Sequence, residues 1–370
     1  MSKLGPLILL THLCLSFSII SSAKAASIQA DFETTPIKQG LTDSDDAAYY
    51  HHRPNPNDSE ILAVSKCDET PSCGGLYVYD LTGTEKQRLD VGKLNNIDTS
   101  IIAGETIAFA SNREDLGVSV FNRRSGSWQH QGSLATLDEQ NRVYEPYGLC
   151  SYQNQVAVSS KQGKIYLYRY DGENLDLTQT IDLSEVAAPY DNFIKDVVIK
   201  TATAKNKTHK LQKYLKQRFV AEGCVFHQKT GDLYIAQENL GVWRYRTEGI
   251  TLIKQIQGPY ADPENQTFTN DVEGIAIYTR QGRDYLVLSS QGISKILFFE
   301  MDQYQLVASN SFYLNDFDPV TETDGVLAVS ASSDLYPEGF LVLHDDENQN
   351  NDGTLSPANY KIISMSKLSL

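Results

Sequence analysis

The sequence lacks the short motifs that identify several classes of hydrolase and nucleotide-binding protein. It contains no Gly-x-Ser-x-Gly elbow, no P-loop and no Arg-His-Gly sequence, and no cysteine is followed by arginine at the sixth position. Its seven histidines show no metal-ligand spacing. These absences argue against a covalent serine, cysteine or histidine nucleophile and against a histidine-based metal site.

Positive charge is also scarce. The chain has 32 lysines and arginines against 47 aspartates and glutamates, and its formal net charge is −15. Such a surface repels nucleic acid and anionic lipid and suits multivalent cations. We therefore expect neither a nucleic-acid partner nor a membrane partner.

The longest apolar stretch lies at the N-terminus. Lys3 provides a charged start, the range 7–20 is mostly apolar, and Ala23-Lys24-Ala25 has the small-x-small pattern of a cleavage site. We expect a signal peptide over 1–25, cut after Ala25, and a secreted or periplasmic protein with a net charge of −17, because Lys3 and Lys24 leave with the leader. A transmembrane anchor is disfavoured because the run is short for a span of about 20 residues.

Cysteines are few, and four of the five remain after the leader. Cys67 and Cys73 are close in sequence and flank Pro71, so a small disulfide loop is plausible in an oxidising compartment. Cys150 and Cys224 follow glycines of the repeat described below. For these two, buried apolar packing is the favoured interpretation.

Short β-branched and aromatic runs dominate the remaining chain, and Gly, Asn and Asp separate them. Examples are the ranges 76–79, 165–168, 233–236, 242–245 and 285–288. The 21 tyrosines also fit sheets better than helices. The sequence therefore predicts an all-β protein.

These runs recur in units of similar length. Each unit opens with a polar or acidic residue, and the openers are Asp46, Asp98, Tyr147, Glu222, Glu273 and Asp324. Their spacings are 52, 49, 75, 51 and 51 residues, and about 50 residues is the length of a four-stranded propeller blade. We expect one domain over 26–370, a six-bladed β-propeller with four-stranded antiparallel blades around a central channel.

The spacing of 75 residues indicates a basic insertion at about 190–218. The range 195–218 has eight lysines and arginines against the single acid Asp196, and Leu211, Leu215 and Phe219 have helical spacing. A solvated insertion between blades is the favoured interpretation. The alternative is a lid or an arm that gathers anions.

The openers should converge on one rim of the channel, because the innermost strand of each blade runs along it. Five of the six are acidic, and second acids stand nearby at Asp45, Asp271 and Glu322. Carboxylates that face one small space cannot all stay ionised without counter-charge, and oxygen ligands favour Ca²⁺. The alternative is that each acid caps its own turn or is solvated.

Three cations occur at or just beyond the ends of the second strands of their units, namely Lys66, Arg113 and Lys161. Beside a metal-charged acidic site they would suit an anionic, oxygen-rich substrate such as phosphate. A phosphatase without a covalent nucleophile would use metal-activated water. Three ordinary surface cations are the alternative.

Several short sequences together carry a resemblance to a known family. They are Asp45-Asp46-Ala47-Ala48, the ranges 75–81 and 92–98, Ala110-Ser111-Asn112-Arg113, Asp271-Val272-Glu273-Gly274, Ser289-Ser290-Gln291-Gly292 and Thr323-Asp324-Gly325. In combination the chain resembles the β-propeller phytases, which are six-bladed, calcium-dependent bacterial phosphatases. The resemblance covers roughly residues 33–363. It implies hydrolysis of phytate, myo-inositol hexakisphosphate, by attack of metal-activated water in a monomeric 3-phytase-type enzyme.

The resemblance also implies roles for particular residues. Expected calcium ligands are Glu33, Asp45, Glu222, Glu238, Asp271, Glu273 and Asp324, with Asp46, Asn96 and Asp98 at a channel calcium and Asp318, Asp345 and Asn348 at a structural calcium. Expected phosphate-binding residues are Lys66, Arg113, Tyr147 and Lys161, with Gln291 in a matching motif. Glu222, Lys66 and Arg113 are expected to take part in catalysis.

The chain also departs from the family pattern. Cys67 stands where members often have a second lysine, and Gln237 replaces one glutamate of a pair. A phytase-like propeller of weak or no activity, which binds anionic ligands or a protein partner, is therefore an alternative. A lactonase-type propeller with a single channel metal is another.

Overall fold

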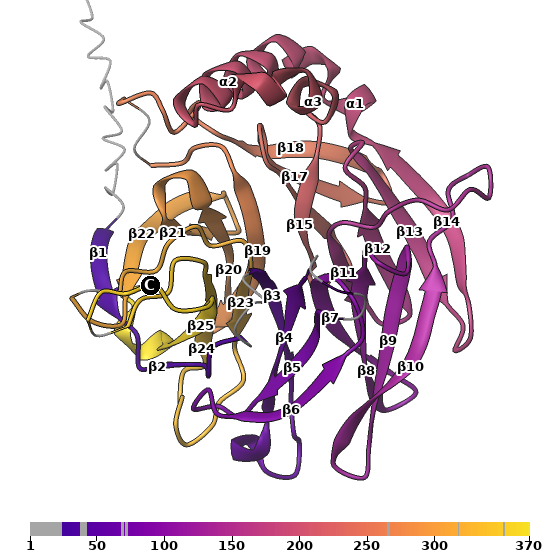
Figure 1. The fold of residues 1–370 in the computed structure, drawn as a ribbon, viewed down its shortest axis with the longest axis vertical. Coiled ribbons are helices and arrows are strands. Elements are labelled where there is room, and N and C mark those ends of the chain that lie inside the picture. The colour runs from indigo at the N-terminus through magenta and orange to yellow at the C-terminus, as the bar shows by residue number, and fades with distance from the viewer. Residues whose placement is uncertain are drawn as a thin grey trace, which may run out of the picture.

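The alternating strands assemble into six sheets arranged as blades around a channel (Figure 1). The computed structural model describes residues 24–37, 43–67, 70, 73–264, 267–316, 318–350 and 352–370, so most of the expected signal peptide lies outside the described residues. The expected six-bladed propeller is confirmed. Within the described part of the chain, no helix is both long and apolar enough to cross a membrane.

Each of the first three blades is one continuous stretch of sequence whose strands run from the channel outward. The first contains β3 (Asp43–Tyr50), β4 (Glu60–Lys66), β5 (Gly75–Tyr79) and β6 (Glu85–Asp90). The second contains β7 (Leu94–Ile102), β8 (Glu105–Asn112), β9 (Gly117–Arg124) and β10 (Ser127–Ala135). The third contains β11 (Leu149–Tyr152), β12 (Gln155–Ser159), β13 (Lys164–Tyr170) and β14 (Leu175–Asp182).

The last three blades continue the ring and use both ends of the chain. The fourth contains β15 (Ala221–Phe226), β16 (Leu233–Gln237), β17 (Gly241–Arg246) and β18 (Gly249–Gln255). The fifth contains β19 (Val272–Arg280), β20 (Arg283–Ser290), β21 (Lys295–Glu300) and β22 (Gln305–Tyr313), with β1 (Lys24–Gln29) parallel to β22. The sixth contains β23 (Val326–Val329), β24 (Phe340–Asp345) and β25 (Asn359–Ser364), and β2 (Phe32–Glu33) completes it as the outer strand.

The central strands are apolar on both faces because each blade packs between two others. In β4, Ile61 and Ala63 pack toward the sixth blade, whereas the alternate residues Leu62 and Val64 pack toward the second. Period-two alternation sends successive side chains to opposite faces of a sheet, so both sets are buried here. This explains why the strands are nearly continuous apolar runs.

The insertion in the longest repeat is helical. It contains α1 (Leu183–Val186), α2 (Asp191–Ala204) and α3 (Leu211–Lys216), with short 3₁₀ turns at Ala188–Tyr190 and Thr208–Lys210. Figure 1 shows the three helices packed together beside the blade of β15, β17 and β18. Four α2 side chains are buried, namely Ile194, Val197, Val198 and Ala202. The insertion lies between the third and fourth blades as expected, but it is only partly solvated, because α2 contributes an apolar face to the core whereas α3 has no buried residue.

Two disulfides join described residues. The expected Cys67–Cys73 disulfide is confirmed, with a Cα–Cα distance of 5.5 Å. Cys150 and Cys224 form a second disulfide with a Cα–Cα distance of 5.6 Å, so the interpretation of these two as simple apolar packing was wrong. Both lie near the starts of innermost strands, β11 and β15, which contact each other around the channel. Ring geometry thus joins residues that are 74 positions apart in sequence.

Candidate active site

A β-bulge at the start of the innermost strand places two residues at the channel rim in four of the blades. In these bulges the pairs 45–46, 95–96, 222–223 and 273–274 each lie opposite a single residue of the second strand. A bulge bends the strand and redirects its side chains. The first bulge residues are Asp45, Asn95, Glu222 and Glu273, which shows that these four positions are structurally equivalent.

This register corrects two of the repeat openers. Asp45 and Asn95, rather than Asp46 and Asp98, occupy the position of Glu222 and Glu273, because all four are the first residue of the bulge in their strand. The acidic ring is therefore interrupted by an amide at Asn95.

Glycine follows several ring residues because the next blade approaches closely. A Cβ on Gly223 would lie 1.9 Å from the backbone oxygen of Glu273, and a Cβ on Gly148 would lie 1.7 Å from that of Glu222. No side chain fits at these distances. The acid-glycine sequence thus lets neighbouring inner strands approach until their carboxylates share one space.

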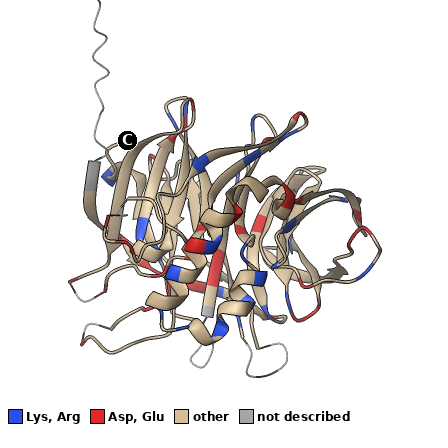
Figure 2. Cartoon of the chain, turned by 90° about the horizontal axis from the view of Figure 1, so that it is seen from above, with Lys and Arg blue, Asp and Glu red and all other residues tan. Residues whose placement is uncertain are grey.

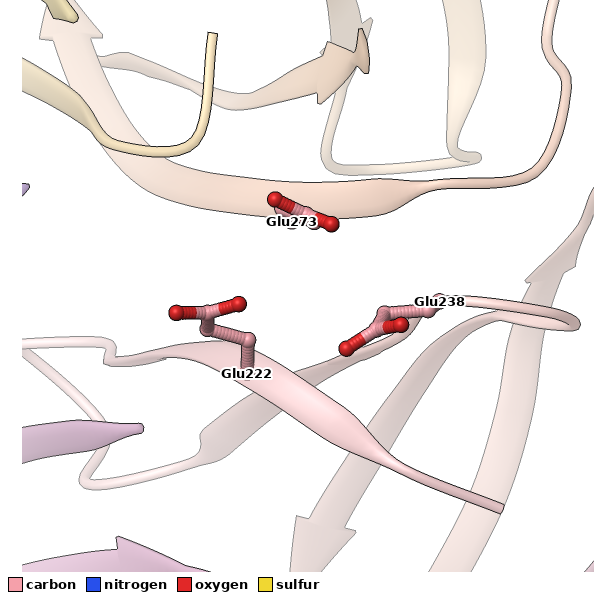
Figure 3. A group of neighbouring side chains, drawn as sticks. All are labelled: Glu222, Glu238 and Glu273. Carbon is pink, nitrogen blue, oxygen red and sulfur yellow. The ribbon is translucent and has the colours of Figure 1, made fainter. Parts of the chain in front are cut away.

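Three glutamates meet at this rim (Figure 3). Glu222 lies on β15, Glu273 on β19 and Glu238 just after β16, and one carboxylate oxygen of each lies within 4.8 Å of the others. The Oε1 atom of Glu238 is buried and accepts no hydrogen bond from any described residue. An unpaired buried carboxylate oxygen beside two further carboxylates fits the oxygen-rich site that a hard divalent cation requires.

The electrostatics of the three glutamates support the same interpretation. Burial, together with the carboxylates of Glu222 and Asp271, holds the pKa of Glu238 well above its ordinary value. Burial and the nearby Asp324, Glu222 and Glu238 raise the pKa of Glu273 well above its ordinary value. Without a cation, these groups are therefore driven to hold protons.

A second part of the rim links Asp45, Lys66, Asp324 and Gln291. The Lys66 ammonium lies 3.1 Å from Asp45 and 3.9 Å from Asp324. Gln291 donates from its amide to Glu273 and to Asp324. Burial acts to raise the pKa of Asp324, but His344 and Lys66 outweigh it and hold that pKa below its ordinary value.

The remaining predicted phosphate-binding residues lie on the other side of Glu222. Asn95 donates to Glu222 at 2.6 Å and accepts from Arg113 at 3.2 Å, so the guanidinium is connected to the glutamates. Two cations lie close to the Tyr147 ring, with Lys161 Nζ at 4.5 Å and Arg113 Cζ at 5.8 Å from its centroid. Asn95 is a site residue that the sequence reasoning missed, and the signal that could have found it was its bulge register.

Asp271 reaches the site through an unusual backbone conformation. It precedes β19 with a φ of 57°, and the bulge follows directly, so it and Glu273 do not simply alternate along a regular strand. Both nevertheless line one pocket of about 290 Å³ together with Tyr147, Lys161, Glu238 and Gln291. Lys205 of the insertion forms an ion pair with Asp271 at 3.0 Å.

The residues expected at a channel calcium lie lower in the channel and close together. Asp46 accepts from the Asn96 side chain at 3.2 Å and from the Ile97 amide at 3.3 Å, and Asp98 accepts from the Ser151 amide at 2.7 Å. Burial raises the pKa of Asp46 to about 7 and that of Asp98 to about 6. Both carboxylates line the channel cavity.

Glu33, Asp318, Asp345 and Asn348 also come together, but around a lysine. The Lys361 ammonium lies 2.7 Å from Glu33, 2.6 Å from Asp318 and 3.2 Å from Asp345. It also donates to the amide oxygens of Asn348 at 2.9 Å and Asn359 at 3.0 Å. The sequence reasoning did not single out this lysine.

Comparison with known proteins identifies the family to which this site belongs. A family model described as phytase matches residues 2–370. The chain belongs to the phytase family. It is 27% identical over 386 residues to a 3-phytase of Bacillus subtilis strain 168, covering 98% of this chain and 90% of that protein. The expectation of a phytase-type phosphatase is confirmed at this level.

One solved structure can be compared with this phytase-family chain. It is described as a streptogramin B lyase, with a TM-score of 0.48 and 11% sequence identity, covering 90% of this chain and 86% of that chain.

Proposed function

We propose that this phytase-family protein releases phosphate from phytate in a calcium-dependent reaction. The observation that carries the proposal is the cluster of Glu222, Glu238 and Glu273 next to the cations Lys66, Arg113 and Lys161. Carboxylates that require counter-charge, beside cations that suit a phosphate group, match a metal-assisted phosphomonoesterase.

The chain's own residues have distinct roles in this reaction. Calcium held by Glu222, Glu238 and Glu273 would neutralise their charge. It would also lower the pKa of a nearby water, so that the water could lose a proton and its oxygen could attack phosphorus. Arg113 can contact a phosphate with two parallel donors, and Lys161 and Lys66 can supply point charges. Attack forms a new phosphorus–oxygen bond, breaks the ester bond and leaves the inositol oxygen to take up a proton.

The cations of the site are already oriented for this task. Asn95 and Glu145 hold the Arg113 guanidinium, the latter through a 2.6 Å contact with its Nε atom. Tyr147 packs against both Arg113 and Lys161. Positioning charges before the substrate arrives avoids reorganisation during the reaction. We expect the enzyme to act as a monomer, since one chain supplies every residue invoked.

The two disulfides support the expected secreted or periplasmic location. Disulfides persist in oxidising compartments and are rare in the cytosol. The disulfides therefore support an enzyme that acts outside the cytoplasm, where calcium is more abundant than in the cytosol.

The test is phosphate release from phytate by the chain, with and without a calcium chelator. We expect phosphate release that depends on calcium. The rate of release should fall about a hundredfold or more in Glu238→Gln, but not in the control Glu248→Gln, which changes an exposed glutamate. Chelation should also lower the melting temperature, because an ion that binds only the folded state stabilises it. Phytate binding without phosphate release would favour the non-catalytic alternative, and lactone hydrolysis would favour the lactonase alternative.

A further inference from the structure

We propose that the helical insertion over 183–218 forms a wall of the active-site pocket and binds a further phosphate group of the substrate. The proposal rests on the proposed function and adds a binding site to it. The pocket that contains Glu238, Asp271 and Glu273 is also lined by three lysines of the insertion, Lys205, Lys207 and Lys213. Figure 2 shows the helices from above, with Lys and Arg in blue close to the acidic residues in red.

The insertion is held in place over the rim at several points. Ile194 and Val198 pack into the core of the third and fourth blades, and Val197 packs into the core shared with the fifth. Two ion pairs join the insertion to the segment before β19, namely Lys200 with Asp262 at 3.2 Å and Lys205 with Asp271 at 3.0 Å. These contacts fix the end of α2 beside the carboxylates.

The lysines of the insertion differ in how their charge is used. Lys195 and Lys200 pair with Asp191 and Asp196 on their own helix, and Lys205 pairs with Asp271. Among described residues, no carboxylate lies within ion-pair distance of Lys207 or Lys213. The ammonium groups of Lys207 and Lys213 therefore have room to bind an anion that enters the pocket.

The ligand class follows from the geometry. The pocket already has Tyr147 and Lys161 from the propeller, and the insertion adds Lys207 and Lys213, together with Tyr214 and Gln217, from its own wall. A ligand with a single phosphate can occupy only one side. An inositol carrying several phosphates can contact both walls, so the insertion should discriminate between polyphosphorylated and monophosphorylated substrates.

The test compares two double variants of the same insertion. Lys207→Ala/Lys213→Ala should raise the KM for phytate about tenfold with little change in kcat. The reason is that two solvent-exposed ion pairs between these lysines and phosphate groups of the substrate are lost. The control Lys210→Ala/Lys216→Ala removes two exposed lysines of the insertion that do not line the pocket, and should leave KM unchanged. Hydrolysis of an inositol monophosphate should be unaffected in both.

The outcomes separate this inference from the proposed function. Equal KM values for phytate in wild type and Lys207→Ala/Lys213→Ala would overturn the inference while leaving the phytase activity intact. Absence of phosphate release by the wild type would overturn the proposed function instead. In that case calorimetric binding of phytate, weaker in the pocket double variant and unchanged in the control, would still support the insertion site.

A second and independent observation concerns the buried lysine at the sixth blade. We infer that the ammonium of Lys361 replaces a metal ion among Glu33, Asp318, Asp345 and Asn348. Lys361, Asp318 and Asp345 are each 0% exposed, and the ammonium contacts five oxygen-bearing side chains. A calcium ion and this ammonium cannot occupy the same centre, so the residues do not fit a structural calcium here.

The position of this cluster gives the lysine a structural role. Lys361 and Glu33 are directly paired in the register of β25 with β2, the short N-terminal strand that completes the sixth blade. The Lys361 ammonium also joins Glu33 on β2 to Asp345 on β24, so it links strands from both ends of the chain. A cation attached to the chain therefore closes the propeller.

Calcium stoichiometry tests this inference. Calorimetric titration of wild type and Asp318→Asn should give the same number of bound calcium ions, whereas loss of one equivalent in Asp318→Asn would overturn the inference. Lys361→Gln should have a lower melting temperature in chelator. Added calcium should restore that temperature more in Lys361→Gln than in wild type, and equal responses would argue against an interchangeable cation position.

Discussion

Removal of the Cys150–Cys224 disulfide should destabilise the propeller more than removal of Cys67–Cys73. The two bonds close loops with sequence separations of 74 and 6 residues. The loss of chain entropy in the unfolded state grows with loop length, which gives about 4.5 kcal/mol for the longer loop and about 2.2 kcal/mol for the shorter. We therefore expect Cys150→Ala/Cys224→Ala to lose about 2 kcal/mol more unfolding free energy than Cys67→Ala/Cys73→Ala.

The comparison is matched because each disulfide has one cysteine that is at most 9% exposed, Cys67 or Cys150, and one that is partly exposed, and because both variants delete two sulfur atoms. Urea denaturation of wild type and both double variants, monitored by tryptophan fluorescence, gives the three free energies. The difference should persist in the presence of a calcium chelator, since it originates in the unfolded chain. Equal losses, or a larger loss for the short loop, would refute the reasoning.

Three further predictions concern the rim. Gly223→Ala should unfold the chain or cost more than about 4 kcal/mol, because its methyl group would meet the Glu273 backbone oxygen; a folded variant whose unfolding free energy in urea equals that of the wild type would contradict this. Calcium binding should weaken as pH falls, because the raised pKa values of Glu238 and Glu273 mean that protons compete with the ion; calorimetry across pH 5–8 should show this, with protons released on binding. Arg113→Lys should lower kcat/KM for phytate about tenfold, since lysine cannot make two parallel contacts, and an unchanged value would exclude a direct phosphate contact.

Repetition made the fold readable from sequence. Strand-length apolar runs at intervals of about 50 residues define blades without any knowledge of contacts. Closure of the ring was not readable in the same way, because β2 is two residues long and pairs with β25 from the other end of the chain. Local pattern carries no information on which distant strand a short edge segment will join.

The candidate site was predictable in its chemistry but not in its register. Acidic residues before glycine indicated the rim, and the structure brings Glu222, Glu238 and Glu273 together there. Asp46 and Asp98 were assigned one or more positions away from the ring because bulges do not alter composition or period visibly. Lys361 was missed for a related reason, since a lysine within an apolar strand gives no sign of which carboxylates surround it.

Propeller topology explains why the insertion can act at the site. The chain passes from the outermost strand of one blade to the innermost strand of the next, and Glu222 and Glu273 stand where those innermost strands begin. The ends of second strands lie at the same rim because adjacent strands are antiparallel, and Lys66 is the last residue of β4. An insertion between β14 and β15 must therefore end beside Glu222, whereas one between a first and second strand would lie on the opposite face. The longest repeat thus lengthens a type of connection that can alter substrate binding without disturbing the blades.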